Sequence, residues 1–317
     1  MSILTDFHLY YGPDALAAPP QVRKIGPRDC FAALAEGFDD FLAMPSHVAF
    51  LGLFYVVAGL VLGSLSSLGG ALQLLFPIAS GFALVGPVVA IGLYELSRRR
   101  ELGLSADWRD AFVVVRSPAL PAILALGLLL MAIFAAWIGS AEALYVWLYG
   151  PNPPTSTGVF LIDVLTSSRG WLLIGIGGAI GFCFAALALC LSIVSFPLLL
   201  DRDVGLVAAV GASLRTAWTN PIAVALWGLI VATLLVLGSL PLFIGLAILM
   251  PVLGHATWHF YRRAIVRDPA HEHPAQWPRE SLRRPDSFYT SPHSVLFPWP
   301  TAEEKDGKTS GAPQPPT

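Results

Sequence analysis

Long stretches without a charged residue are the feature that most restricts how this chain can fold. The longest run from Val48 to Leu93, from Trp171 to Leu200 and from Ile222 to Leu253. Each reaches or exceeds the roughly 20 apolar residues that a membrane-spanning helix needs. Over the whole chain 13% of residues are charged, whereas soluble domains carry roughly 25%. The sequence therefore predicts an all-α polytopic membrane protein.

Six segments are apolar and long enough to be expected as transmembrane helices. They are residues 48–65, 71–93, 120–138, 171–198, 222–238 and 241–261. Fusing the last two would give a helix of about 60 Å, roughly twice the hydrocarbon thickness of a bilayer. We therefore predict a tight turn between Gly238 and Pro241.

This topology divides the chain into segments with different surroundings. We expect an N-terminal cytoplasmic segment at 1–27, a six-helix membrane domain at 28–266 and a disordered cytoplasmic tail at 267–317. The tail is rich in proline and polar residues, a composition typical of disorder. Residues 139–170 become an external loop that contains Pro151, Pro153 and Pro154.

The distribution of basic residues predicts the orientation. With six spans, Arg169 is the only basic residue between the third and fourth spans, and the side that carries the termini receives almost all the others. Lys and Arg are retained on the cytoplasmic side of membrane proteins. The sequence therefore predicts that both termini lie in the cytoplasm.

Three short amphipathic stretches precede the odd-numbered spans, and each ends in a proline. Their apolar residues are Phe31, Leu34, Phe38 and Phe41 in the first, Trp108, Phe112 and Val115 in the second, and Val207, Val210, Leu214 and Trp218 in the third. Spacings of three and four place these side chains on one face of a helix. We expect all three helices to lie along the cytoplasmic interface.

Each even-numbered span also contains a proline, namely Pro87, Pro197 or Pro251. The order of interfacial helix, span and proline-containing span thus occurs three times, which indicates a degenerate threefold repeat of helix pairs. The alternative is that membrane helices simply tolerate proline often. Both interpretations remain open at this point.

Five runs along the chain resemble a family of predicted bacterial integral membrane proteins, the domain of unknown function 2189. They are Gly37–Phe41, Gly81–Gly103, Ser195–Gly205, Ala225–Leu229 and Pro251–Arg263. The resemblance extends from about Val22 to Val266. It implies a multi-pass protein of the bacterial inner membrane without an established activity.

Some members of that family are labelled as cytochrome c oxidase subunits, which requires a chemical check. A haem–copper centre needs several histidines that converge from different helices. The histidines in or beside the expected spans are His47, His255 and His259. We therefore do not assign oxidase chemistry to this chain.

His255 and His259 are the candidate metal ligands, because residues four apart lie on the same side of a helix. They could share a metal or flank a haem. Alternatively, they form hydrogen bonds at the level of the lipid headgroups, beside Trp258 and Tyr261.

The repeat adds a second candidate site. Asp201 and His255 both lie four residues after a repeat proline, and Glu95 and His259 both lie eight residues after one. If the repeats pack around one axis, these four residues form a cytoplasmic polar cluster that binds a cation or a small ligand. The alternative is local pairing, of Glu95 with Arg98 and Arg99 and of Asp201 with Arg202.

The sequence favours a function without catalysis. It contains no recognisable nucleotide-binding loop, nucleophile elbow or zinc-protease helix, so we predict no catalytic residue and no cofactor. The net charge of −2 gives no reason to expect nucleic acid. We expect the lipid bilayer and other membrane proteins as partners, and the oligomeric state is left open. The preferred hypothesis is a scaffold, assembly or regulatory component. The alternatives are a transporter for a small or lipophilic molecule and a metal- or haem-binding accessory of a redox complex.

Overall fold

The structure is a computed structural model that describes residues 20–44, 90–154, 156–240, 245–270 and 272–273. Within these ranges the regular structure is helical, and the β-structure consists of two isolated bridges. The all-α class is therefore confirmed for the described residues. Expected span 48–65 and nearly all of expected span 71–93 lie outside them.

The helices are α1 (Pro27–Ala43), α4 (Ile91–Glu101), η2 (Trp108–Arg116), α5 (Leu120–Tyr149), α6 (Thr157–Thr166), α7 (Ser168–Ser192), α8 (Ser195–Asp201), α9 (Leu206–Thr219), α10 (Pro221–Ser239) and α11 (Leu246–Ala264).

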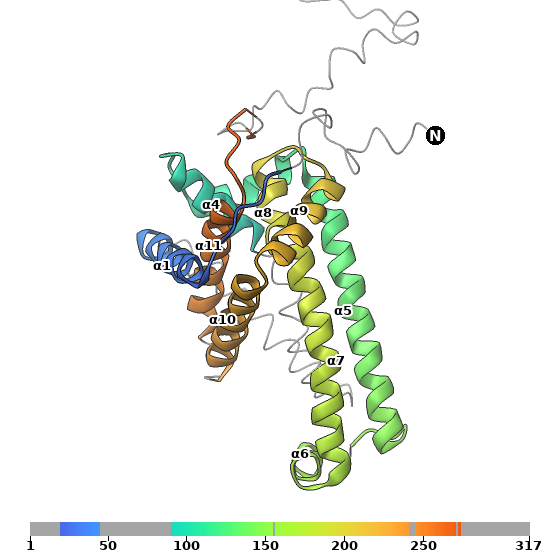
Figure 1. Cartoon of the computed structure of the whole chain (residues 1–317). Coiled ribbons are helices and arrows are strands. Elements are labelled where there is room, and N and C mark those ends of the chain that lie inside the picture. Colours follow the sequence, from blue (N-terminus) through green and yellow to red (C-terminus); the bar gives the residue numbers. More distant parts are fainter. Residues whose placement is uncertain (1–19, 45–89, 155, 241–244, 271, 274–317) are drawn as a thin grey trace, which may run out of the picture. The chain divides into compact units, whose positions relative to one another are not determined.

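Three stretches of the described chain are helical, long and apolar enough to cross a membrane. They are Leu120–Tyr149, Ser168–Asp201 and Pro221–Ser239, and they contain the spans expected at 120–138, 171–198 and 222–238. The helices α5 and α7 pack side by side (Figure 1). Gly181 lies directly beneath Trp137, since a Cβ atom there would be 3.0 Å from the indole ring. Small residues of this kind let membrane helices approach closely.

The last expected span, 241–261, corresponds to α11, which does not belong to these three stretches. Its second half carries His255, His259, Arg262 and Arg263, which lower its apolar character. The turn before it is present but longer than expected, because α10 ends at Ser239 and α11 begins at Leu246. The two helices meet at glycines: a Cβ atom on Gly245 would lie 2.8 Å from the Cα atom of Gly238.

The expected external loop at 139–170 is largely helical, and its position outside the membrane stays a prediction. The helix α5 continues to Tyr149 through good helix formers such as Ala and Leu, and α6 follows after a short connection that contains the prolines. Ser156 caps α6 by accepting a hydrogen bond from the backbone N–H of Val159. Ser167 caps α7 in the same way, with the N–H of Gly170 as donor.

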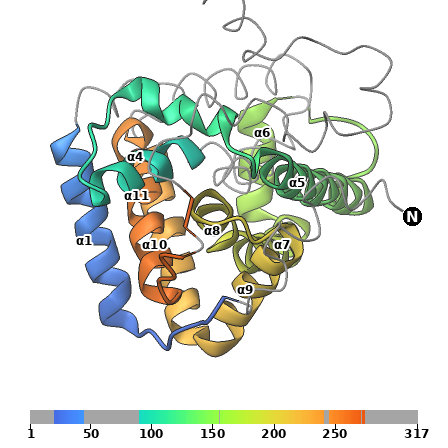
Figure 2. The same ribbon diagram turned by 90° about the horizontal axis from the view of Figure 1, so that it is seen from above.

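The short helix α8 and the helices α4 and α11 contact one another, and α1 packs along α11 (Figure 2). Aromatic side chains fill this region: the rings of Trp227 and Phe260 are 5.0 Å apart, and both residues are buried. The contact between α1 and α11 is very close. A Cβ atom on Gly37 would overlap the backbone of Ala256, so the two helices touch without an intervening side chain.

The three stretches expected to be amphipathic form α1, η2 and α9, of which η2 is a 3-10 helix. Large apolar side chains on each are exposed rather than buried, for example Phe31, Phe112 and Trp218. Small or polar residues occupy the opposite, buried faces, such as Asp40 on α1 and Thr216 on α9.

Both ends of the described chain attach to the helices. The backbone N–H of Arg23 donates to Ala264, and that of Val266 donates to Gln21. Further along, the N–H of His273 donates to the carbonyl of Asp201 at 2.7 Å. Contact with the helical domain therefore continues beyond residue 266, where the tail was expected to begin.

Candidate functional site

Buried charged and polar side chains gather where α4, α8, α11 and α1 meet. Glu95, Ser97, Arg98, Asp201 and His255 are all almost completely shielded from solvent. Charged groups in such surroundings are costly unless they are paired and hydrogen-bonded. They form two groups, which we call the α1 network and the α8 network. The α1 network consists of Glu36, Asp40, Ser97, Arg100, His255, His259 and Arg263, and the α8 network consists of Glu95, Arg98, Glu101, Asp201, Tyr261, Arg262 and Glu272.

In the α1 network, His259 bridges two carboxylates on α1. Its Nε2 lies 2.9 Å from Oδ2 of Asp40, and its Nδ1 lies 3.1 Å from Oε2 of Glu36. Arg263 binds the same Glu36 carboxylate through both terminal nitrogens, at 2.6 and 2.7 Å. This charge-assisted, bidentate contact is of the strong kind. The Arg263 hydrogen bond holds the pKa of Glu36 below its ordinary value.

Ser97 links the two α1-network residues that lie deepest. Its hydroxyl donates to Oδ2 of Asp40, and its oxygen lies 2.7 Å from Nδ1 of His255. A hydroxyl has one hydrogen to donate. Because Ser97 donates its hydrogen to Asp40, His255 Nδ1 must be the donor in its hydrogen bond with the Ser97 oxygen. Arg100 pairs with the other oxygen of Asp40. Burial alone would raise the pKa of Asp40, but hydrogen bonds from His259 and Ser97 hold it below its ordinary value.

The α8 network is centred on Asp201 at the end of α8. Its Oδ2 accepts hydrogen bonds from Tyr261 at 2.6 Å and from Arg262 at 2.9 Å. Arg98 joins Asp201 to Glu95, since its Nε lies 3.6 Å from Asp201 Oδ1 and its Nη1 donates to Glu95 at 3.3 Å. Burial raises the pKa of Glu95, and the neighbouring Arg98 opposes that rise.

The segment after α11 completes the α8 network. Glu272 accepts from Arg262 at 3.2 Å and from Arg267 at 2.8 Å. The Arg98 guanidinium donates to the backbone carbonyl of His273 at 2.6 Å. Burial, together with the positive charge of Arg98, lowers the pKa of His273 to about 4. The segment is thus fixed by both backbone and side-chain bonds.

The four residues expected to form one cluster are divided between the two networks. Glu95 and Asp201 share Arg98, whereas His255 and His259 both interact with Asp40. The expected local pairs also occur, with Glu95 3.3 Å from Arg98 and 4.0 Å from Arg99. Asp201 lies 3.7 Å from Arg202. Whether the cluster binds a ligand stays a prediction.

Several residues of the two networks were not predicted from the sequence. The most important are Glu36 and Asp40, which lie four residues apart on the face of α1 opposite the exposed Phe38. That spacing matches the spacing of His255 and His259 on α11. The signal was therefore present in the sequence, but it required knowing that α1 packs against α11. Ser97 and Tyr261 carried no comparable signal.

Within the described ranges, three of the four ring nitrogens of the two histidines are directed at protein groups, and His255 Nε2 is the exception. His259 places both ring nitrogens against carboxylates, and His255 places Nδ1 against Ser97. No group of three or more His, Cys, Asp or Glu residues in those ranges is arranged to hold a metal ion. Metal binding by His255 and His259 stays a prediction.

Comparison with known protein families identifies the central part of the chain. Residues 75–201 match the family model described as a predicted integral membrane protein (DUF2189). This confirms the resemblance over that range. The DUF2189 match contains Glu95, Arg98 and Asp201, but it excludes α1 and α11. No curated protein and no solved structure matches the chain.

The DUF2189 match is narrower than the resemblance read from the sequence. Gly81–Gly103 lies inside it, and Ser195–Gly205 overlaps it as far as Asp201. The motifs at Gly37–Phe41, Ala225–Leu229 and Pro251–Arg263 lie outside it. The family description establishes a membrane protein and no more specific role.

Proposed function

We propose that this chain is a non-enzymatic scaffold or assembly component of the bacterial inner membrane. One observation carries the proposal: the buried polar residues bind one another and thereby fix α1 and the segment after α11 to the helical domain. Polar groups that bind one another in this way fix the positions of the helices. A rigid arrangement of helices at the membrane surface gives other membrane proteins a defined surface to bind, as a scaffold requires.

The exposed apolar faces support a location of α1, η2 and α9 at the cytoplasmic interface. On α1, Phe31, Phe38 and Leu42 are exposed while the charged Asp40 points toward α11. On α9, Trp218 is 90% exposed and Thr216 is buried. Helices with their apolar side outward are unfavourable in water but suited to the boundary between headgroups and acyl chains.

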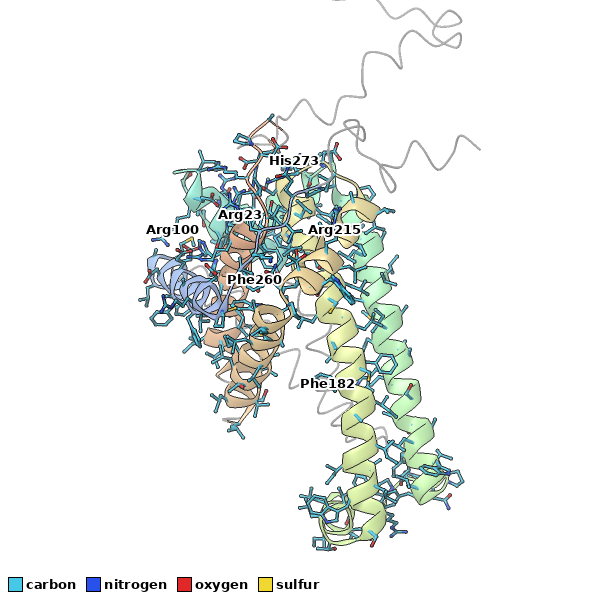
Figure 3. The ribbon with its side chains drawn as sticks, in the orientation of Figure 1. Arg23, Arg100, Phe182, Arg215, Phe260 and His273 are labelled. Atoms are coloured by element: carbon cyan, nitrogen blue, oxygen red, sulfur yellow. The ribbon has the colours of Figure 1, made fainter. Side chains whose placement is uncertain are left out.

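The charge distribution supports a cytoplasmic position for this end of the molecule. Figure 3 shows Arg23 and Arg215 near α8 and α9, and it shows Arg100 at the same level of the view, beside α1. Arg169 lies at the start of α7, at the opposite end of the α5 and α7 pair (Figure 1). This asymmetry agrees with the positive-inside rule, and it favours six spans with both termini in the cytoplasm.

Helix contacts support the degenerate threefold repeat. Each proposed repeat begins with an interfacial helix and ends with α4, α8 or α11, and these three terminal helices contact one another. Each interfacial helix also contacts the terminal helix of the preceding repeat: η2 contacts α4, α9 contacts α8, and α1 contacts α11. Contacts that follow one another in this cyclic order are expected when similar units close into a ring.

The two alternative functions make different demands on the same residues. A transporter needs polar groups along a pathway, and a metal- or haem-binding accessory needs imidazole nitrogens directed at the metal. Most polar groups of the α1 and α8 networks are directed at one another instead. This arrangement favours the scaffold.

Co-purification tests the proposal with a matched pair of variants. The tagged full-length chain is isolated from native membranes in mild detergent, beside Asp40→Asn, which loosens α1, and Asp39→Asn, which changes an exposed residue of the same helix. We expect a stoichiometric partner to co-purify with the wild type and with Asp39→Asn, and less of that partner to co-purify with Asp40→Asn.

Isolation of the chain without a partner, together with a solute that raises its melting temperature, would favour the transporter. A haem absorbance band or bound metal that disappears in His255→Ala and His259→Ala would favour the redox accessory.

A further inference from the structure

The helix α6 has one face directed at the ends of α5 and α7. The ring of Phe160 packs edge-on against Tyr145 and Tyr149, at 5.9 and 5.6 Å. The two tyrosine rings are stacked on each other at 5.3 Å. Val164, four residues after Phe160, lies so close to α7 that a Cβ atom on Gly170 would overlap its backbone. These contacts hold α6 against the helix pair.

The charged residue of α6, Asp163, also lies on this inner side. Its carboxylate accepts hydrogen bonds from Nε and Nη2 of Arg169, both at 3.0 Å. The Arg169 guanidinium in turn lies 4.6 Å from the centre of the Tyr149 ring, a distance suited to a cation–π contact. Phe160, Asp163 and Val164 follow the spacing of one helical face. The inner face is therefore both aromatic and charge-paired.

The opposite face of α6 is apolar and uncovered. Val159, Leu161, Ile162 and Leu165 are 62, 56, 64 and 52% exposed. Two tryptophans at the same end of the helix pair are also exposed, Trp147 on α5 and Trp171 on α7. A contiguous exposed apolar surface of this kind marks an interaction site.

The length of α7 places this surface at a membrane boundary. From Trp171 to Ser192 the helix rises about 32 Å at 1.5 Å per residue, which matches the roughly 30 Å of the hydrocarbon core. When Ser192 lies at one boundary, Trp171 lies at the other. Tryptophan is enriched at that level of membrane proteins.

We propose that α6 lies in the membrane interface, in the leaflet remote from the arginine-rich ends of α4 and α11. Val159, Leu161, Ile162 and Leu165 enter the upper part of the acyl chains, with Trp147 and Trp171 beside them. Asp163 lies on the inner face and is paired with Arg169, so its charge does not point toward the acyl chains. The segment expected as a loop outside the membrane is therefore a second membrane anchor for the α5 and α7 pair.

Lipid is a better occupant of this face than a second protein. The helix has 10 residues, and one side of it is small beside the roughly 1,200 Å² that stable protein interfaces bury in total. Insertion into lipid needs no matching surface, and its strength grows with the apolar area that is buried. The proposal depends on the protein being membrane-embedded, but not on its acting as a scaffold.

Spin labelling of the full-length chain tests the proposal. Single cysteines are introduced as Ile162→Cys and Leu165→Cys after Cys30, Cys183 and Cys190 are replaced by alanine. Asn152→Cys, exposed in the connection before α6, is the control. Each variant is labelled with a nitroxide in vesicles of phosphatidylethanolamine and phosphatidylglycerol, and near-UV circular dichroism confirms that its fold is unchanged. The collision rates with oxygen, which concentrates in lipid, and with a water-soluble nickel chelate are then measured.

We expect the oxygen-to-nickel ratio at Ile162 and Leu165 to be several-fold higher than at Asn152. A ratio equal to that of Asn152 would place α6 in water and overturn the proposal. Labels that neither reagent reaches would show a face covered by protein, which overturns it too. In that case, distance measurements between labels would separate a second copy from another partner.

Discussion

His259 on α11 and Asp40 on α1 lie 2.9 Å apart, although 219 positions separate them in the sequence. Asp40 also accepts the hydroxyl of Ser97 and pairs with Arg100. This one carboxylate therefore joins three helices of the described chain. The first prediction concerns its removal.

Replacing Asp40 by Asn removes the negative charge, so Arg100 loses its anionic partner and His259 keeps only Glu36. Asp40 is buried but Arg100 is 43% exposed, so the loss is smaller than for a fully buried ion pair. We expect the free energy of unfolding in detergent to fall by about 1–3 kcal/mol. Asp39→Asn is the control, because Asp39 is exposed on the same helix and surface changes stay within about 0.5 kcal/mol. Equal stability of the two variants would contradict a structural role for Asp40.

Acidification is expected to release α1 through the carboxylates of the α1 network. The pKa values of Glu36 and Asp40 are lowered in the folded protein. Groups with a lowered pKa stabilise the folded state above the unfolded pKa, which is about 4 for carboxyl groups, and lose that contribution as the pH falls through the folded pKa. Hydrogen exchange of the 27–43 segment should therefore rise below about pH 4. Glu36→Gln should show high exchange at neutral pH already.

The segment after α11 should loosen at a higher pH. His273 has a folded pKa of about 4, below the 6.5 of an exposed histidine, because the neutral ring is buried. Its contribution is complete above about pH 6.5 and is lost as the pH falls from there toward 4. We expect exchange in residues 265–273 to rise over this window. In His273→Ala this pH dependence should be lost, and its persistence would assign the effect to another group.

The sequence predicted three of the six expected spans, at 120–138, 171–198 and 222–238, where the described chain has long apolar helices. It could do so because hydrophobicity and length are local properties. It also identified Glu95, Asp201, His255 and His259, since ionisable residues beside apolar segments are conspicuous. It did not predict Asp40 or Tyr261 as their partners, because such pairs depend on which helices pack together. The helix α6 was missed because its apolar residues form a short run beside three prolines. A run of that length does not distinguish a loop from a helix.

Gly37 should be sensitive to substitution because α1 and α11 touch at this position. In Gly37→Ala the new Cβ atom would overlap the backbone of Ala256, and backbone yields less readily than a side chain. Overpacking of this kind costs about 1–3 kcal/mol. Gly211→Ala on α9 is the matched control, since nothing lies within 4 Å of its Cβ position. There we expect a gain of about 0.5–1 kcal/mol from the higher helix propensity of alanine. Thermal unfolding in detergent measures both.

A second glycine pair tests the packing of the two longest apolar helices. At Gly181 on α7 a Cβ atom would lie 3.0 Å from the ring of Trp137 on α5, whereas at Gly178 it would meet nothing within 4 Å. Gly181→Leu should therefore push α5 and α7 apart, because the added side chain has to displace a buried indole. Gly178→Leu, on a more open side of the same helix, should leave the pair intact. Cysteine cross-linking between Leu144 and Gly177, whose Cβ position lies 3.4 Å from that leucine, measures the separation. We expect efficient cross-linking in the Gly178→Leu background and a marked loss in the Gly181→Leu background. Equal cross-linking in both would mean that the two helices are not held together at the Trp137 contact.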